Sequence, residues 1–313
     1  MTAPSDALTQ LIAAELATPV PAGALQMVER IRTQHGDAVR AVVFYGSCLR
    51  TADDQHSLLD FYVLVDSYWR LGTRRLYAWL NALLPPNVYY LESSEAGRMV
   101  RAKYAVVSLA DFARYTSPSA FQAYFWGRFA QPCALVYAAD ADARAAATAA
   151  VANAVTAFVQ CGLGLVPAPC SVQTLWTAQL AQSYRAEVRA ERTAVVDQLY
   201  GAAAERYERV TRAALARMPF PVTVSVADGV TSITARTPGG GPGLWAMRRA
   251  YGKLLSLLRI LKSGLTQEHS VEYAMWKVER HSGVRTDPEW QRRHPLLALG
   301  EQVWRMYRKD AIR

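Results

Sequence analysis

Cysteine is scarce in this chain, and long apolar runs are missing from its sequence. The four cysteines, Cys48, Cys133, Cys161 and Cys170, have no Cys-x-x-Cys spacing, which argues against a zinc site and against a disulfide framework. No segment reaches the roughly 18 apolar residues of a membrane-spanning helix, and the N-terminal residues lack the basic and apolar parts of a signal peptide. We therefore expect a cytoplasmic protein with reduced thiols.

The composition is that of a folded chain with an uneven distribution of charge. At 313 residues and 51% hydrophobic residues, the chain is long enough for two domains with cores. Most of the net charge of +9 lies in residues 244–313, which also contain Trp245, Trp276, Trp290 and Trp304. A basic, Trp-rich segment suits an anionic membrane surface or nucleic acid.

The order of apolar runs predicts three successive units. Short β-branched or aromatic runs predict strands that alternate with helices in residues 1–140; these runs are 41–45, 60–66, 87–92, 102–108 and 133–137. This pattern indicates an α/β (α+β) domain with a mixed sheet. Residues 141–238 read as mainly helical with one hairpin around Asp228-Gly229, which is compatible with a winged-helix-like domain. We expect residues 239–313 to form a basic, amphipathic, helical region that associates with a membrane.

The turn between the first two predicted strands has the residue types of a phosphate site. Gly46 permits a tight turn after the apolar run that ends at Tyr45, and Ser47 can cap the next segment, so that free backbone N–H groups point at one spot. Asp60 opens the next strand, where a carboxylate can hold Mg²⁺ against a triphosphate. The pattern is typical of polymerase-beta-like nucleotidyltransferases. An ordinary loop between two strands is the alternative.

One carboxylate of that pattern is missing. Nucleotidyltransferases usually carry two carboxylates two residues apart on this strand, and Tyr62 occupies the second place here. Asp66 lies about 20 Å along the strand from Asp60, at roughly 3.3 Å per residue, and cannot substitute. We expect either Glu92, after a neighbouring strand, to act as the second metal ligand, or a site with more phosphate and water ligands.

The start of the tail predicts an amphipathic helix from Trp245 to Leu265. Leucines and an isoleucine form a broad apolar face over residues 254–261, and basic residues recur every three or four positions on the other side. We expect membrane contact through Trp245, Arg248, Arg249, Lys253, Arg259 and Lys262. The alternatives are a helix packed on the domain with its basic side in water, or a dimerisation surface that would make the protein a homo-oligomer.

Several motifs occur together in the order of a known family. They are Phe44-Tyr45-Gly46-Ser47, Leu59-Asp60-Phe61 with Val65-Asp66, Val88-Tyr89-Tyr90, Gly97-Arg98-Met99 with Lys103-Tyr104, and Tyr124 with Gly127-Arg128-Phe129. Across about residues 44–137 they resemble the successive motifs of the mitochondrial-type phosphatidate cytidylyltransferases, the translocator assembly and maintenance family. Further on, Ser183-Tyr184 with Glu187-Val188-Arg189 is similar to a motif of that family's second domain.

The resemblance implies a reaction and a set of partners. CTP and phosphatidic acid would give CDP-diacylglycerol and pyrophosphate with Mg²⁺, on a nucleotidyltransferase domain joined to a winged-helix-like domain. The family also has an apolar or aromatic residue at the place of Tyr62. Its Gly-Ser-Gly turn is Gly46-Ser47-Cys48 here, which leaves the phosphate loop one less permissive residue.

Charge chemistry then assigns the roles. We expect Asp60, Lys103 and Arg128 to be catalytic, with the two cations holding the triphosphate or the attacking lipid phosphate. The predicted nucleotide-binding residues are Tyr45, Gly46, Ser47, Lys103, Tyr184 and Arg189, and the predicted metal ligands are Asp60 and Glu92.

The expected partners are CTP, phosphatidic acid and an anionic membrane, with the protein held peripherally at the inner face of the cell membrane. Nucleic acid is not expected, because a ridge of leucines suits lipid better than a phosphate-tracking groove. The rival hypotheses are a toxin-like nucleotidyltransferase that acts on RNA or protein, and a non-catalytic nucleotide-binding module.

Overall fold

The computed structural model describes residues 6–51, 58–95, 98–187, 193–227, 230–235 and 241–266. Its larger sheet has the strand order β3-β4-β2-β1-β5. The strands are β1 (Val39–Tyr45), β2 (Leu58–Val65), β3 (Asn87–Glu95), β4 (Arg98–Ser108) and β5 (Cys133–Ala138). Strand β2 is parallel to β4 and antiparallel to β1, and the pairs β1–β5 and β3–β4 are antiparallel. The predicted α/β class and mixed sheet are therefore confirmed.

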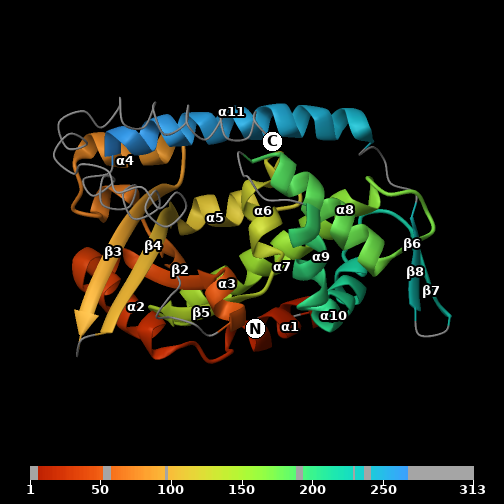
Figure 1. Cartoon of the computed structure of the whole chain (residues 1–313), viewed down its shortest axis with the longest axis horizontal. Helices are drawn as coiled ribbons and strands as arrows, with labels where there is room; N and C mark the ends of the chain where they lie inside the picture. The colour runs from red at the N-terminus through yellow and green to blue at the C-terminus, as the bar shows by residue number, and fades with distance from the viewer. Residues whose placement is uncertain are drawn as a thin grey trace.

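Helices cover both faces of this sheet (Figure 1). On one face α2 (Ala22–His35) packs through Met27 and Ile31 against strand residues such as Phe44 and Phe61. The other face carries the larger core, which includes residues of α1 (Ala7–Leu16), α5 (Leu109–Thr116), α6 (Ala123–Phe129) and α7 (Ala141–Leu163). Shorter elements connect the strands: η1 (Gly36–Ala38), α3 (Ser47–Thr51), η2 (Tyr68–Arg70) and α4 (Arg75–Leu83).

Strand β2 shows how the sequence pattern produces these two layers. Successive side chains of a strand point to opposite faces. Leu59, Phe61 and Val63 accordingly join the core under α2, whereas Tyr62 and Leu64 join the larger core. Asp60 belongs to the second set by the same alternation, which directs its carboxylate toward the helices α5–α7 rather than toward α2.

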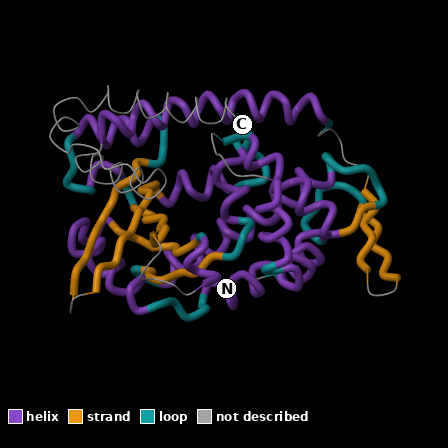
Figure 2. Tube along the Cα trace, in the orientation of Figure 1, coloured by secondary structure: helices purple, strands orange, loops and turns teal. Residues whose placement is uncertain are grey.

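The second half of the described chain is helical with a small sheet. It contains α8 (Val172–Arg185), α9 (Thr193–Gly201) and α10 (Ala204–Leu215), together with β6 (Cys170–Ser171), β7 (Val222–Ala227) and β8 (Val230–Ala235). The three strands form a sheet of order β6-β8-β7, which lies at the opposite end of the molecule from the larger sheet (Figure 2). The predicted hairpin is confirmed, and its turn at Asp228-Gly229 lies outside the described residues. A winged-helix arrangement stays a prediction.

One core crosses the predicted boundary at residue 140. The larger cluster of buried residues runs from Leu8 and Tyr62 to Trp176 and Tyr207 without a break. Two ion pairs add to this continuity, from Arg206 to Glu15 at 2.7 Å and from Arg217 to Asp6 at 2.6 Å. The predicted units 1–140 and 141–238 therefore share a hydrophobic interior.

Helix α7 lies in the middle of that core. Of the described helices it alone is long and apolar enough, by length and composition, to cross a membrane. Its apolar window is 72% buried inside the protein, and its Phe158 stacks on Trp176 of α8. Packing in the core accounts for its apolar character.

Helix α11 (Pro242–Thr266) is amphipathic as predicted and runs along one edge of the molecule (Figure 1). Trp245 is fully buried, and Arg248, Arg249, Arg259 and Lys262 all donate hydrogen bonds to other parts of the protein. Lys253 alone of the predicted membrane contacts is exposed. The basic side faces inward, where carbonyl, amide and aromatic groups contact it. Burial contradicts the predicted membrane contact for Trp245 and Lys262, and for the half-buried Arg248, Arg249 and Arg259 it stays a prediction.

Candidate functional site

A row of paired residues crosses the larger sheet at the predicted phosphate turn. Asp60 pairs with Tyr45 of β1 on one side and with Lys103 of β4 on the other, and Lys103 pairs in turn with Tyr90 of β3. Directly paired residues point to the same face, so these four side chains share one side of the sheet. Lys103 Nζ lies 2.9 Å from Asp60 Oδ1, and both side chains are partly exposed. The structure thus joins two of the three predicted catalytic residues.

Gly46 lies against this ion pair. Its φ of +96° is a backbone conformation that side chains rarely allow, and a Cβ at this position would stand 3.2 Å from Asp60 Oδ2. Glycine is therefore required for the turn and for the close approach of the backbone to the carboxylate. Ser47 is the first residue of α3.

Cys48 is accommodated away from the turn. Its side chain is buried in the core under α2, and its Sγ donates a hydrogen bond to the carbonyl of Leu58 at 3.1 Å. Because the thiol packs between α3 and β2, the third residue of the turn does not occupy the space beside Asp60.

Glu92 is not brought to Asp60. It pairs with Arg101, forms an ion pair with it at 3.1 Å, and accepts a hydrogen bond from Tyr90. Strand β4 lies between β2 and β3, which separates Glu92 from Asp60 by two strand spacings of about 4.8 Å each. Oxygens that share one Mg²⁺ lie about 2.0–2.1 Å from the ion. The structure binds Glu92 to Arg101 and Tyr90 and does not bring it together with Asp60, so its role as the second metal ligand stays a prediction.

Arg128 of α6 lies against Tyr62 and against Tyr45, the residue that pairs with Asp60. Its guanidinium donates to Tyr62 Oη at 3.1 Å and to Tyr124 Oη at 3.2 Å, and its Cζ lies 5.5 Å from the ring centroid of Tyr45. Burial opposes its charge, but the surrounding Tyr124, Tyr62 and Tyr45, together with Glu187, hold the pKa of Arg128 well above its usual value. The group is a permanent cation beside the Asp60 row.

Tyr62 follows Asp60 by two residues on β2. Its ring packs edge-on against Phe129 at 4.8 Å between centroids, and its hydroxyl accepts the hydrogen bond from Arg128. Burial raises the pKa of Tyr62, so it stays neutral. The hydroxyl of Tyr62 is thus engaged by the guanidinium of Arg128.

Glu187 is the partner of Arg128 that sequence reasoning missed. Its carboxylate lies 3.1 Å from Arg128 Nη2, and both side chains are largely buried. Helices α6 and α8 come close enough here that a Cβ at Gly127 would lie 2.9 Å from the Cβ of Ser183. The motif Ser183-Tyr184 with Glu187 therefore meets Gly127-Arg128 in space. Its spacing from Ser183 was visible in the sequence, but no pattern gave the partner.

The structure describes two of the three remaining predicted nucleotide-binding residues, Tyr184 and Tyr45. Tyr184 is half-buried at the edge of the larger core. Tyr45 is packed between Tyr62 and Phe129, and burial and the neighbouring Asp60 raise its pKa to about 12. Arg189 lies outside the described residues.

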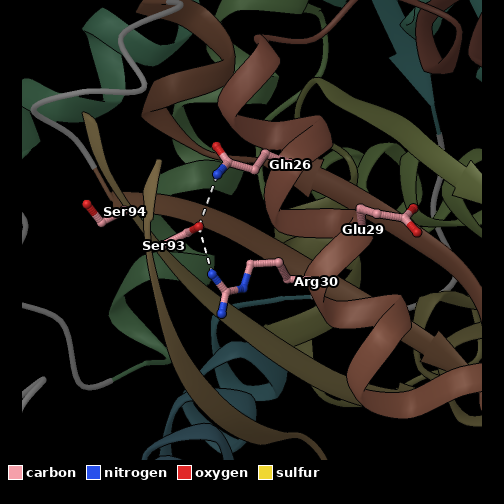
Figure 3. A pocket seen from close by; sticks show the side chains of 5 residues that line it. All are labelled: Gln26, Glu29, Arg30, Ser93 and Ser94. Atoms are coloured by element: carbon pink, nitrogen blue, oxygen red, sulfur yellow. Dashed lines mark hydrogen bonds between the residues drawn. The ribbon is translucent and has the colours of Figure 1, made fainter. Parts of the chain in front are cut away.

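A separate hollow of about 490 Å³ opens between α2 and β3 (Figure 3). It is lined by Gln26, Glu29, Arg30, Ser93 and Ser94. Ser93 Oγ accepts hydrogen bonds from Gln26 and Arg30, at 3.0 Å and 2.9 Å. Since Ser93 alternates with Glu92 along β3, the hollow faces α2 and lies on the side of the sheet away from Asp60.

Comparison with protein families and with curated proteins finds no significant match to this chain. Within the described ranges, no group of three or more His, Cys, Asp or Glu side chains stands close enough to hold a metal ion. The candidate site is therefore identified by its residues alone. It consists of a carboxylate paired with a lysine at a glycine turn, and of a buried arginine surrounded by tyrosines.

Proposed function

We propose that the protein transfers a cytidylyl group from CTP to phosphatidic acid. An oxygen of the lipid phosphate attacks the α-phosphorus of CTP, the bond from that phosphorus to the β-phosphate oxygen breaks, and pyrophosphate leaves with the electron pair. The lipid phosphate is already anionic at neutral pH, so the site has to position and neutralise phosphates rather than remove a proton. The observation that carries the proposal is the meeting of Gly46, Asp60 and Lys103 in front of Arg128.

Each side chain has a role that its position supports. Gly46 lets the backbone approach the triphosphate, and Lys103 supplies a cation that can move from Asp60 to a phosphate oxygen because it is partly exposed. Asp60 would hold Mg²⁺ as its one protein carboxylate, which suits a metal that keeps several waters and takes phosphate oxygens as ligands. When bound, Mg²⁺ supplies positive charge for the pyrophosphate leaving group.

The surface of α11 favours an amphiphilic acceptor. Its apolar side chains point outward, and Met247, Leu254, Leu257 and Leu261 are each more than half exposed. Exposed apolar surface also occurs on α4, where Leu76, Trp79 and Leu83 are each more than 60% exposed. Contiguous apolar surface of this kind is typical of membrane or protein contacts. We propose that the leucine face of α11, rather than its basic side, rests on the cytoplasmic leaflet that holds the lipid substrate.

Tyr62 supports a second candidate, a nucleotide-binding module without turnover, because its hydroxyl is bonded to Arg128 where a metal carboxylate would otherwise stand. Such a module would bind CTP with Mg²⁺ and release no pyrophosphate.

The deciding experiment supplies the protein with Mg²⁺, CTP labelled at the α-phosphate, and vesicles that contain phosphatidic acid. The proposal expects label in CDP-diacylglycerol and an equal amount of pyrophosphate. Label in added RNA or in a protein, with none in lipid, would replace the lipid acceptor by the toxin-like alternative. CTP binding in calorimetry without any product would favour the module.

A further inference from the structure

Two guanidinium groups from distant parts of the chain lie against the ring of Tyr124. The Cζ atom of Arg128 on α6 lies 4.5 Å from the centre of this ring, and the Cζ atom of Arg259 on α11 lies 4.2 Å from it. Arg128 also donates a hydrogen bond to the Tyr124 hydroxyl. The tyrosine ring therefore brings a residue of the C-terminal helix into the candidate site.

The two cations are unequally compensated. Arg128 has the carboxylate of Glu187 at 3.1 Å. Arg259 donates instead to neutral acceptors, the carbonyl of Pro85 at 2.8 Å and Gln122 Oε1 at 2.9 Å. Among the residues that the structure describes, no ion pair joins Arg259 to an acidic side chain. The described side chains around Arg259 therefore supply hydrogen-bond acceptors but no opposite charge.

Effects on neighbouring groups agree with this excess of positive charge. Burial alone would raise the pKa of Tyr124, yet Arg128 and Arg259 together lower it. Lys262, three residues after Arg259 on α11, has its pKa lowered to about 7 by burial and by the charge of Arg259. Its Nζ donates to the carbonyls of Leu84 and Pro86, so that α11 is tied to the connection before β3.

We propose that Arg259 completes, together with Arg128, the subsite that holds the phosphate of the acceptor lipid; this assignment rests on the proposed function. A phosphate monoester carries up to two negative charges, and guanidinium groups bind its oxygens in pairs. Arg128 lies against Tyr45, the residue paired with Asp60, so the subsite lies beside the place assigned to the triphosphate.

The opposite face of the same helix explains why an α11 residue would serve a lipid. Leu257, Leu258 and Leu261 flank Arg259 in sequence and are exposed on the outer side. A helix with its side chains is about 10 Å across, so a headgroup has to rise by about that distance from the leaflet to reach Arg259. Helix α11 would thus present its leucine face to the leaflet, and Arg259 would bind the headgroup on the side of the helix that faces the protein.

The test separates headgroup binding from membrane contact by using a short-chain, water-soluble phosphatidic acid as the acceptor. Arg259→Gln is expected to raise the KM for this acceptor roughly tenfold or more, as for the loss of one charge-assisted hydrogen bond, with little change in the KM for CTP. Arg259→Lys should recover part of the loss, because it keeps the charge without the planar fork. Arg249→Gln is the matched control, since Arg249 is bonded on the same inward side of α11, to Gln182 of α8, and does not touch Tyr124.

Three outcomes decide the matter. An unchanged KM for the soluble acceptor in Arg259→Gln, or an equal rise for CTP and acceptor, overturns the assignment while the proposed function stands. An equal rise in Arg249→Gln would also overturn it, because then any loosening of α11 has the same effect. If the wild type forms no product, the proposed function fails, and calorimetry of the short-chain lipid with wild type and Arg259→Gln decides the subsite separately: equal binding, or none, refutes it.

Discussion

Replacement of Gly46 by alanine tests the geometry of the phosphate turn. The backbone at Gly46 has φ of +96°, and forcing an L-residue into such a conformation costs about 1–2 kcal/mol of stability. The new methyl group would also lie 3.2 Å from Asp60 Oδ2 and 3.5 Å from its Cβ, so the carboxylate has to move by a few tenths of an ångström. Since a displacement of about 1 Å can reduce a rate roughly 100-fold, we expect a loss of about tenfold in kcat/KM.

The matched control for this change is Gly72→Ala. Gly72 has φ of +68°, but no atom lies within 4 Å of the Cβ that alanine would add. Both variants should lose a similar free energy of unfolding in a denaturant titration, and only Gly46→Ala should lose cytidylyl transfer at a temperature where both are folded. Equal activities of the two variants would refute the role of Gly46 in positioning Asp60.

Three further changes test the buried charges and the outer face of α11. Glu187→Gln leaves a largely buried guanidinium without its carboxylate and should lower the free energy of unfolding by about 3 kcal/mol. The same change at the exposed Glu29 should cost less than about 1 kcal/mol, and equal losses would contradict the buried pair. Burial lowers the pKa of Lys262 from 10.5 to about 7, so between these pH values the unfolded chain binds one proton more than the folded protein. The free energy of unfolding of the wild type should therefore rise with pH relative to that of Lys262→Met. A constant difference between the two stability curves would argue against burial of the amine. Leu257→Glu should weaken binding to anionic vesicles roughly tenfold or more in a flotation assay. Leu25→Glu, a change at an equally exposed leucine on α2, should leave binding unchanged. If both variants stay on the vesicles, the leucine face of α11 is not the membrane contact.

Local pattern was sufficient for most of the secondary structure. The apolar run before Gly46 became β1, the run after Asp60 became β2, and the Ala-rich stretch after Asp140 became α7 with the Asp140 side chain as its N-cap. These elements arise from side-chain periodicity and capping, which act within a few residues. The two units predicted on either side of residue 140 share one hydrophobic core. Local sequence patterns could not predict this, because the core is formed by helices that are far apart in sequence.

The sequence marked the residues of the candidate site but not how they meet. Asp60 and Lys103 stand in separate motifs, and their side chains meet because β2 and β4 turn out to be adjacent parallel strands with these two residues in register. The sequence does not reveal that β4 inserts between β2 and β3, which separates Glu92 from Asp60. The inward position of Arg259 could not be read from the sequence either, since an amphipathic helix fixes which residues share a face and leaves open which face is covered.

We propose that Asp60 is the single carboxylate of a cytidylyl transfer site. The most direct test of this proposal measures pyrophosphate release from CTP, in the presence of Mg²⁺ and phosphatidic acid, for Asp60→Asn and for Asp66→Asn. Asp66 ends the same strand region in an ion pair with Arg70, away from the glycine turn, and so controls for the loss of one paired carboxylate. We predict a fall of about 100-fold or more for Asp60→Asn and near wild-type release for Asp66→Asn. Release by Asp60→Asn that equals the wild-type rate would contradict the assignment.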